Sequence, residues 1–197
     1  IAATMLGSRL THGIFMTGGF FLGPRDFYER LRTMPAQELA KIDMTRIDFI
    51  NQLYGTQAGS GDLKSAQRRK ARFMNTTMIV TALGAAVSDA LDSGQVVSGV
   101  GGQYNFVAMA HALPDARLVM MLRATHDNKD GVTSSIVWNY GHVTIPRHLR
   151  DIVVTEYGVA DLRGQSDAEV IKRLVAVADS RFQDELVAQA KAAGKLE

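Results

Sequence analysis

Short apolar segments alternate with longer segments of helical spacing through the second half of the chain. Residues 117–122 and 151–155 are mostly apolar and predict buried strands, and residues 95–98 and 134–138 predict two shorter ones. Residues 104–113 repeat apolar side chains every three or four positions, which predicts a helix. Strands separated by helices are typical of a layered α/β domain, whose mixed or largely parallel sheet is flanked by helices.

The end of the chain predicts two helices with recognisable boundaries. Ser166 and Glu169 form the Ser-x-x-Glu pattern of a capping box, in which each side chain bonds a free backbone N–H of the first turn. A final helix is predicted at residues 181–193. Gly194 is suited to end it, because glycine adopts the left-handed backbone conformation without strain.

The first half gives weaker signals. Pro24 is suited to begin a helix, predicted at residues 26–34, because its fixed φ matches the first helical turn. Gly, Ser and Thr predict a loop at residues 54–61, and polar residues predict another at 126–131. Three apolar segments predict strands, namely residues 14–21, 47–53 and 78–87.

Composition mainly excludes classes of function. The chain has no cysteine, which excludes disulfides, thiolate metal sites and a cysteine nucleophile. The absence of cysteine also fits a cytoplasmic protein, which is what we expect. No apolar run has the length of a membrane span and no signal peptide is recognisable, so we expect no membrane partner. The net charge of +2 gives no reason to expect nucleic acid, and the basic residues within 64–72 are typical of a solvated helix face.

The strongest candidate for ligand binding is the glycine-rich segment at residues 98–103, between a predicted strand and a predicted helix. Gly99, Gly101 and Gly102 let a ligand approach the main chain closely. The helix that follows would offer free N–H groups to a phosphate, a carboxylate or an oxyanion. The segment is not a dinucleotide fingerprint, since position 104 is Tyr104 rather than glycine. The alternative is a tight turn with no ligand.

A second candidate is Glu156, which directly follows the predicted strand at residues 151–155. Ligands of open α/β sheets bind at the carboxyl ends of the strands, so a carboxylate there is well placed for chemistry. The alternative is a structural carboxylate paired with a nearby arginine, Arg163 or Arg147.

The five histidines carry no metal signal, because no two of them have the helical spacing of a zinc motif with a Glu between them. His142 and His148 flank a predicted loop, and we expect structural or solvated roles for them. The sequence therefore predicts no metal site.

Several segments between residues 98 and 186 form a recognisable set when they are taken in order. They read Ser98-Gly-Val-Gly-Gly-Gln-Tyr-Asn-Phe106, Ser134-Ser-Ile-Val137, Val143-Thr-Ile-Pro-Arg147, Ile152-Val-Val-Thr-Glu-Tyr-Gly-Val-Ala-Asp-Leu-Arg-Gly164 and Asp179-Ser-Arg-Phe-Gln-Asp-Glu-Leu186. The set resembles the acetyl-CoA hydrolase/CoA-transferase family. The family includes enzymes that act on 4-hydroxybutyrate, butyrate or succinate, and its motifs include Gly-x-Gly-Gly-Gln-x-(Asp/Asn)-Phe and Val-Val-Thr-Glu-Tyr-Gly.

The resemblance implies a domain of the NagB/RpiA/CoA-transferase type and an acyl-CoA substrate, with no metal. In this family a Glu carboxylate attacks the thioester, giving a mixed anhydride and then a glutamyl-CoA thioester; a carboxylic acid or water is the acceptor. By the resemblance, Gly99, Gly101, Gly102 and Gln103 would contact CoA or the thioester oxygen, and Glu156 would be catalytic near the acyl group.

The family register also implies what lies outside the sequence. None of the six Glu residues has the context of the family's nucleophile, so we expect that Glu upstream of Ile1. Residues 1–197 would then be the C-terminal domain of a longer chain, inactive alone, whose N-terminal domain is a partner. The surface that this domain would cover is expected to be apolar, which predicts a possible homodimer.

Two other functions stay open at this point. A CoA-binding module without turnover would explain the expected absence of the nucleophile. A sugar-phosphate isomerase-like domain shares the general architecture, although few residues favour it. The segment at residues 82–94 departs from the family's Glu-x-Asp-Leu-x-Gly pattern, so the acyl group and its acceptor are not predicted.

Overall fold

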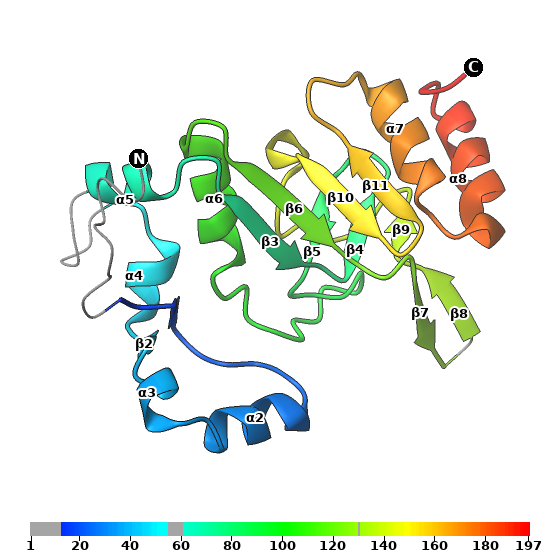
Figure 1. The fold of residues 1–197 in the computed structure, drawn as a ribbon. Coiled ribbons are helices and arrows are strands. Elements are labelled where there is room, and N and C mark those ends of the chain that lie inside the picture. Colours follow the sequence, from blue (N-terminus) through cyan, green and yellow to red (C-terminus); the bar gives the residue numbers. More distant parts are fainter. Residues whose placement is uncertain (1–12, 55–60, 130) are drawn as a thin grey trace. The chain divides into compact units, whose positions relative to one another are not determined.

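The computed structural model describes residues 13–54, 61–129 and 131–197 (Figure 1). The chain divides into two compact units, Ile1–Gly61 and Asp62–Glu197, which are described separately. The predicted loop at residues 54–61 lies almost entirely outside the described residues.

The described part of the first unit, residues 13–54, contains two short parallel strands and three helices. β1 (Met16–Gly18) pairs with β2 (Ile42–Met44), and α2 (Arg25–Arg32) and α3 (Ala36–Leu39) lie between them in the chain. α2 confirms the helix predicted after Pro24. The strand predicted at residues 47–53 is wrong, because α4 (Ile47–Asn51) occupies this segment. Ile47 and Ile50 are three residues apart, a spacing that places both on one side of a helix.

The second unit begins within α5 (Gly61–Gln67) and is organised by a four-stranded mixed sheet (Figure 1). The strand order in this sheet is β11-β10-β6-β3. Three of its strands are parallel, namely β3 (Arg72–Thr76), β6 (Arg117–Met121) and β10 (Ile152–Thr155). The fourth, β11 (Gly158–Asp161), is antiparallel to β10. β6 and β10 confirm predicted strands, whereas β3 was not predicted. Exposed and partly buried positions alternate along β3, but its sequence Arg-Phe-Met-Asn-Thr does not alternate polar with apolar residues and so gives no strand signal.

Two predicted segments, the strand at residues 78–87 and the loop at residues 126–131, differ in the structure. The predicted strand at residues 78–87 is a hairpin of β4 (Ile79–Thr81) and β5 (Ala86–Val87), because the chain reverses at Gly84 with a φ of +91°. β4 also pairs in parallel with β9 (Ile136–Val137). The predicted polar loop at 126–131 is the hairpin of β7 (Thr125–Asn128) and β8 (Gly131–Ser134). Most of its side chains are exposed, so no apolar alternation marks it in the sequence.

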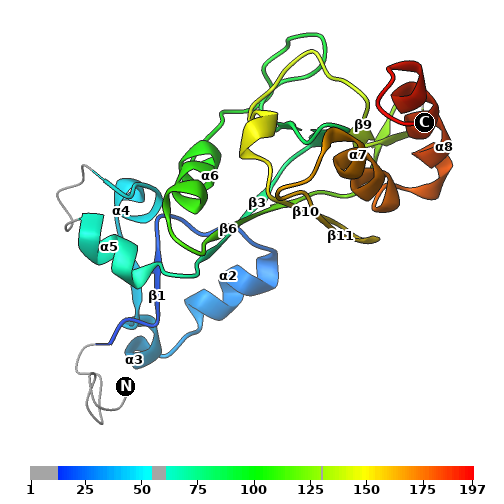
Figure 2. The same cartoon turned by 90° about the horizontal axis from the view of Figure 1, so that it is seen from above.

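Three helices complete the unit. α6 (Gln103–Ala112) packs on β3 and β6, α7 (Asp167–Ala176) packs on β11, and α8 (Ser180–Ala192) lies beside α7 (Figure 2). The Ser166 hydroxyl accepts a hydrogen bond from the backbone N–H of Glu169, which confirms this part of the predicted cap. A short 3-10 helix, η1 (Arg147–Leu149), precedes β10. Together these elements confirm the predicted α/β class with a mixed sheet.

The two faces of the four-stranded sheet differ in their surroundings. Leu118, Met120 and Val153 point to the face that α6 and α7 cover, and they belong to the main core with residues from both helices. On the opposite face, Met74 of β3 and Val159 of β11 are each 66% exposed. Helices therefore cover one face, and part of the other is apolar and open within the described residues.

The long segment between β5 and α6 has little regular structure. The strand predicted at residues 95–98 is wrong, since only a single bridge pairs Val96 with Ala90. Every residue from 91 to 101 is exposed, so this segment has no sheet neighbour that would extend the pairing.

Candidate functional site

Three parallel strands end together at one edge of the sheet. Thr76 of β3 and Val154 of β10 are both in register with Met121 of β6. The residues that follow these strands therefore meet at the carboxyl edge, where ligands of α/β sheets bind.

The glycine loop, defined here as residues 98–102, leads into the amino end of α6. Gly101 has a φ of +61°, a conformation that side chains other than glycine adopt only with strain, and the space beside Gly99 and Gly101 is open. No side chain caps the helix, and the amides of Gln103, Tyr104 and Asn105 have no acceptor among the described residues. The loop thus presents free N–H donors to an anionic ligand.

Gln103 ties the start of α6 to the end of β3. Its buried side-chain amide donates to the backbone oxygen of Thr76 at 2.7 Å, and its Oε1 has no hydrogen-bond partner among the described residues. The side chain is therefore turned into the domain. Its structural role is to bring the glycine loop to the carboxyl edge of the sheet, while a contact with CoA stays a prediction.

Glu156 lies at the tip of the hairpin between β10 and β11. Its Oε2 accepts a hydrogen bond of 2.8 Å from the backbone N–H of Ala124, which follows β6. The alternative of an arginine partner is not found, because Arg163 pairs with Asp161 and Asp151, and Arg147 pairs with Asp167. The carboxylate is exposed and is held at the sheet edge by a main-chain donor.

Two hydrogen bonds, one buried and one partly buried, hold the hairpin that carries Glu156. The Thr155 hydroxyl donates to the backbone oxygen of Val177 at 2.7 Å, and the Tyr157 hydroxyl donates to Asp179 at 2.8 Å. The hydrogen bond to Asp179 is the main reason why the pKa of Tyr157 is raised. Bonds from Arg181 and from Tyr157 lower the pKa of Asp179, so this carboxylate stays charged. The hairpin is therefore anchored to the end of α7 and the start of α8.

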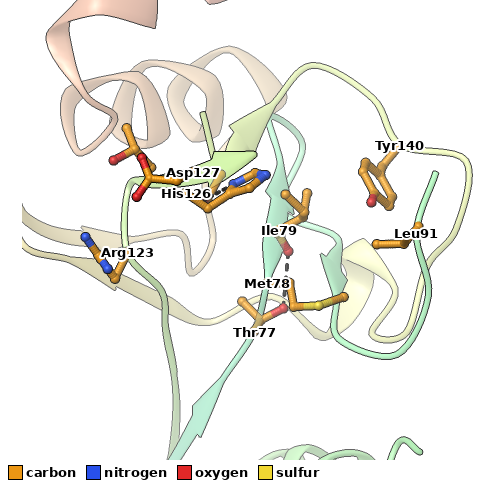
Figure 3. A pocket seen from close by; sticks show the side chains of 10 residues that line it. Thr77, Met78, Ile79, Leu91, Arg123, His126, Asp127 and Tyr140 are labelled. Carbon is orange, nitrogen blue, oxygen red and sulfur yellow. Dashed lines mark hydrogen bonds between the residues drawn. The ribbon is translucent and has the colours of Figure 1, made fainter. Parts of the chain in front are cut away.

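A pocket of about 480 Å³ opens beside this edge (Figure 3). Arg123 and Asp127 lie on one side of it, Leu91 and Tyr140 lie on the other, and Met78 lies between them (Figure 3). The remaining wall is formed by Thr77, Ile79, Thr125, His126 and Ser135. A charged side and an apolar side suit a ligand that joins an anionic group to a short carbon chain.

Arg123 is the basic group of this pocket. It is exposed and forms no ion pair with another residue in the part of the chain that the structure describes. Its neighbour Ala124 binds Glu156, so Arg123 and Glu156 belong to one corner of the sheet edge. A guanidinium can bind a carboxylate or a phosphate through two parallel hydrogen bonds.

His126 is engaged on both sides of its ring. Its Nδ1 lies 3.1 Å from the Ser135 hydroxyl, and its Nε2 lies 3.0 Å from the Thr133 hydroxyl. The imidazole therefore links β7 to Thr133 of β8 and to Ser135, which lies between β8 and β9.

Asp89 fixes the segment that precedes the glycine loop. Its backbone oxygen accepts hydrogen bonds from the amides of Val97 and Ser98, at 2.8 and 3.2 Å. Its carboxylate accepts from the Thr144 hydroxyl and lies 3.1 Å from His142 Nε2. These contacts, that of Thr144 first, lower the pKa of Asp89 although partial burial opposes the shift. His142, for which a structural or solvated role was expected, therefore contacts Asp89.

The structure brings Glu156 to the edge at which α6 begins, but neither Glu156 nor the glycine loop lines the pocket of Figure 3. Sequence reasoning missed Arg123, which directly follows the strand predicted at residues 117–122. The signal that selected Glu156, a charged residue after a buried strand, applies equally to Arg123.

The described residues contain no group of three or more His, Asp or Glu side chains arranged to hold a metal ion. Among the described helices, none combines the length and apolar character that crossing a membrane requires.

Comparison with known proteins gives a consistent result. The family model of the acetyl-CoA hydrolase/transferase C-terminal domain matches residues 23–190. A succinyl-CoA:cyclohexane-1-carboxylate CoA transferase from Geobacter metallireducens is 30% identical over 184 residues, which are 92% of this chain and 38% of the relative. A probable butyrate:acetyl-CoA coenzyme A-transferase from Syntrophomonas wolfei is 39% identical over 98 residues, 48% of this chain and 22% of the relative. The chain therefore spans less than two fifths of these relatives.

Solved structures agree with the sequence matches. The crystal structure of RipA from Yersinia pestis superposes with a TM-score of 0.68 at 29% identity, covering 91% of this chain and 37% of that one. A 4-hydroxybutyrate CoA-transferase from Porphyromonas gingivalis shares the fold, with a TM-score of 0.61 at 22% identity over 90% of this chain and 37% of that one.

Proposed function

The chain belongs to the acetyl-CoA hydrolase/transferase family, because residues 23–190 match the C-terminal domain of that family. We therefore propose that the carboxyl edge of the four-stranded sheet forms one wall of an acyl-CoA site. The whole protein would transfer CoA between a short acyl-CoA and a carboxylic acid or water. One observation carries the proposal: the uncapped amino end of α6, with its glycine loop, is tied by Gln103 to the edge that also bears Glu156 and Arg123.

Each group has a chemical role in this proposal. The amides at Gly99, Gly101 and Gly102 donate to a CoA phosphate or to the oxyanion that forms when the thioester carbonyl is attacked. Arg123 binds a phosphate of CoA through paired hydrogen bonds. Glu156 orients the reacting acyl group from its fixed position on the Ala124 amide.

The proposed reaction needs a second carboxylate as nucleophile. Its oxygen attacks the thioester carbonyl carbon, the C–S bond breaks and CoA leaves as the thiolate, so that the acyl group and the enzyme carboxylate form a mixed anhydride. The thiolate then attacks the enzyme's carbonyl carbon and releases the acyl group as a carboxylate. An incoming acid reverses these steps, and water instead gives free CoA. We propose that this nucleophile belongs to another part of the whole protein, so that this chain binds CoA without turnover.

Calorimetry of the chain with CoA tests the proposed site. Arg123→Gln should weaken binding of CoA or acyl-CoA about tenfold or more, because a hydrogen bond to a charged group contributes about 1.5–3 kcal/mol. Arg69→Gln removes the same charge from an exposed position outside the pocket and should leave affinity unchanged. Absence of saturable CoA binding, or equal losses in both variants, would contradict the site.

Turnover is tested separately on the whole protein with short acyl-CoA thioesters and acetate. Thioester exchange or hydrolysis is expected, and Glu156→Gln should lower kcat more than it raises KM. Tight CoA binding with no turnover on any short acyl-CoA would replace the proposal with a non-catalytic CoA-binding module.

A further inference from the structure

A second cavity lies at the opposite edge of the sheet from the pocket of Figure 3. It has a volume of about 510 Å³, and its walls are formed by Arg147, His148, Arg150, Leu162, Arg163, Gly164 and Gln165. These residues precede β10 or follow β11, whereas Glu156 joins the other ends of the same two strands. We call this cavity the arginine pocket.

The lining of the arginine pocket is basic or neutral. Three guanidinium groups face it, and no carboxylate belongs to its walls. Three carboxylates outside the walls pair with these arginines, and with Arg173 and Lys195 the contacts join five cations to three anions. These contacts are Arg147, Arg150 and Lys195 with Asp167, Arg163 with Asp151 and Asp161, and Arg173 with the Asp161 backbone.

The guanidinium groups are fixed before any ligand arrives. Arg150 donates to the backbone oxygens of Leu83 at 2.8 Å and Gln165 at 3.2 Å, and its side chain is only 15% exposed. Arg163 is held by Asp161 through Nε at 2.8 Å. Because these bonds fix the side-chain rotamers, a ligand would lose little affinity to ordering them.

The pairing leaves donors available. A guanidinium carries five N–H groups. Arg147 bonds Asp167 through Nη2 alone, and Arg163 uses Nε and Nη2 for Asp161, so further N–H groups of both residues stay free for the cavity. The same bonds lower the pKa of Asp161 to about 2, so the paired carboxylate remains charged and keeps the arginine oriented.

From this geometry we infer that the arginine pocket binds a phosphate group carried by a small molecule. A phosphate monoester presents several acceptor oxygens and up to two negative charges, which match the fork of a guanidinium and the local excess of positive charge. The volume exceeds that of an isolated phosphate ion and is within the range of small-molecule sites, so it can also accommodate an organic part. The inference does not depend on the acyl-CoA site proposed above.

Binding of inorganic phosphate and pyrophosphate to the chain tests the inference, by calorimetry at constant ionic strength. Saturable binding is expected, and Arg147→Gln should weaken it about tenfold or more. Arg147 is the suitable position, because it is exposed and makes one ion pair, so its loss should leave the fold intact. Arg147→Lys keeps the charge but removes the fork, and should recover only part of the affinity.

Arg69→Gln is the matched control, since it removes one exposed arginine that lines neither pocket and should not affect phosphate binding. The inference is overturned if neither anion binds saturably up to about 10 mM, or if a folded Arg147→Gln chain binds pyrophosphate as well as the parent chain. Loss of acyl-CoA turnover alone would leave it unaffected.

Comparison of CoA with dephospho-CoA identifies the source of the phosphate. If the 3′-phosphate of CoA occupies the arginine pocket, CoA will bind more tightly than dephospho-CoA, Arg147→Gln will abolish the difference, and pyrophosphate will compete with CoA. If pyrophosphate and CoA bind together, the pocket takes the phosphate of a separate small molecule. Both results support the site.

Discussion

Replacement of Thr155 by valine tests how the turn that carries Glu156 is held. The Thr155 hydroxyl is buried, donates to the Val177 oxygen at 2.7 Å and accepts from the Tyr157 amide at 3.2 Å. Valine keeps the branched shape and fits the strand, so the main effect is loss of these two bonds. The Val177 oxygen at the end of α7 then remains buried without its donor.

The expected cost follows from the desolvation of that oxygen. An unsatisfied buried partner costs about 1–3 kcal/mol, and a value near 2 kcal/mol lowers the melting temperature of a chain of this size by about 4–8 °C. Urea unfolding at constant temperature measures the free energy directly. CoA affinity should fall as well, because the hairpin that holds Glu156 against Ala124 loses one anchor.

Thr76→Val is the matched control. It makes the same change on an exposed strand residue whose hydroxyl has no partner among the described contacts. The reasoning is refuted if Thr155→Val changes the unfolding free energy by less than about 0.5 kcal/mol, or if both variants lose the same amount.

Three further predictions concern other parts of the second unit. Gly141→Ala should lower the melting temperature, because its methyl group would lie 2.6 Å from the Asp92 oxygen; an unchanged value would show that the loop moves freely. The Arg163 hydrogen bonds lower the pKa of Asp161 from 3.8 to about 2, so their stabilisation is present above pH 3.8 and is lost as the pH falls toward 2. In Asp161→Asn, the free energy of unfolding measured in urea from pH 2 to 6 should no longer contain this pH-dependent stabilisation. If the free energy of the variant falls toward pH 2 as steeply as that of the parent chain, the prediction is contradicted. Met74→Lys should reduce self-association in sedimentation at unchanged stability if the open sheet face forms a homodimer.

The sequence predicts elements well where a local signal and burial agree. β6 and β10 are buried strands with mostly apolar sequence, and α7 has a capping pattern that the structure uses. The prediction fails where tertiary context decides. The segment of β4 and β5 is apolar throughout, so only the positive φ at Gly84 shows that it reverses. The hairpin of β7 and β8 is exposed and polar, and therefore has no periodic signal.

The candidate site shows the same limit. Glu156 could be selected from its place after a predicted strand, because the carboxyl edge is a property of the fold class. The glycine loop could be selected for its glycines and the helix that follows it, since the strand predicted before it is absent from the described residues. Their anchors could not: Gln103 meets Thr76 across 27 residues, and Glu156 meets Ala124 across 32. Such pairs depend on how distant segments pack, which no local pattern encodes.

The bond between Gln103 and Thr76 has a consequence for how this domain can vary. The position of the α6 amino end is set by the end of β3 and not by the length of the segment that leads to it. The exposed residues 91–98 could therefore gain or lose residues while the free amides of the helix stay in place. In the proposed acyl-CoA site, such changes would alter the surroundings of the acyl group while the α6 amides stay in place.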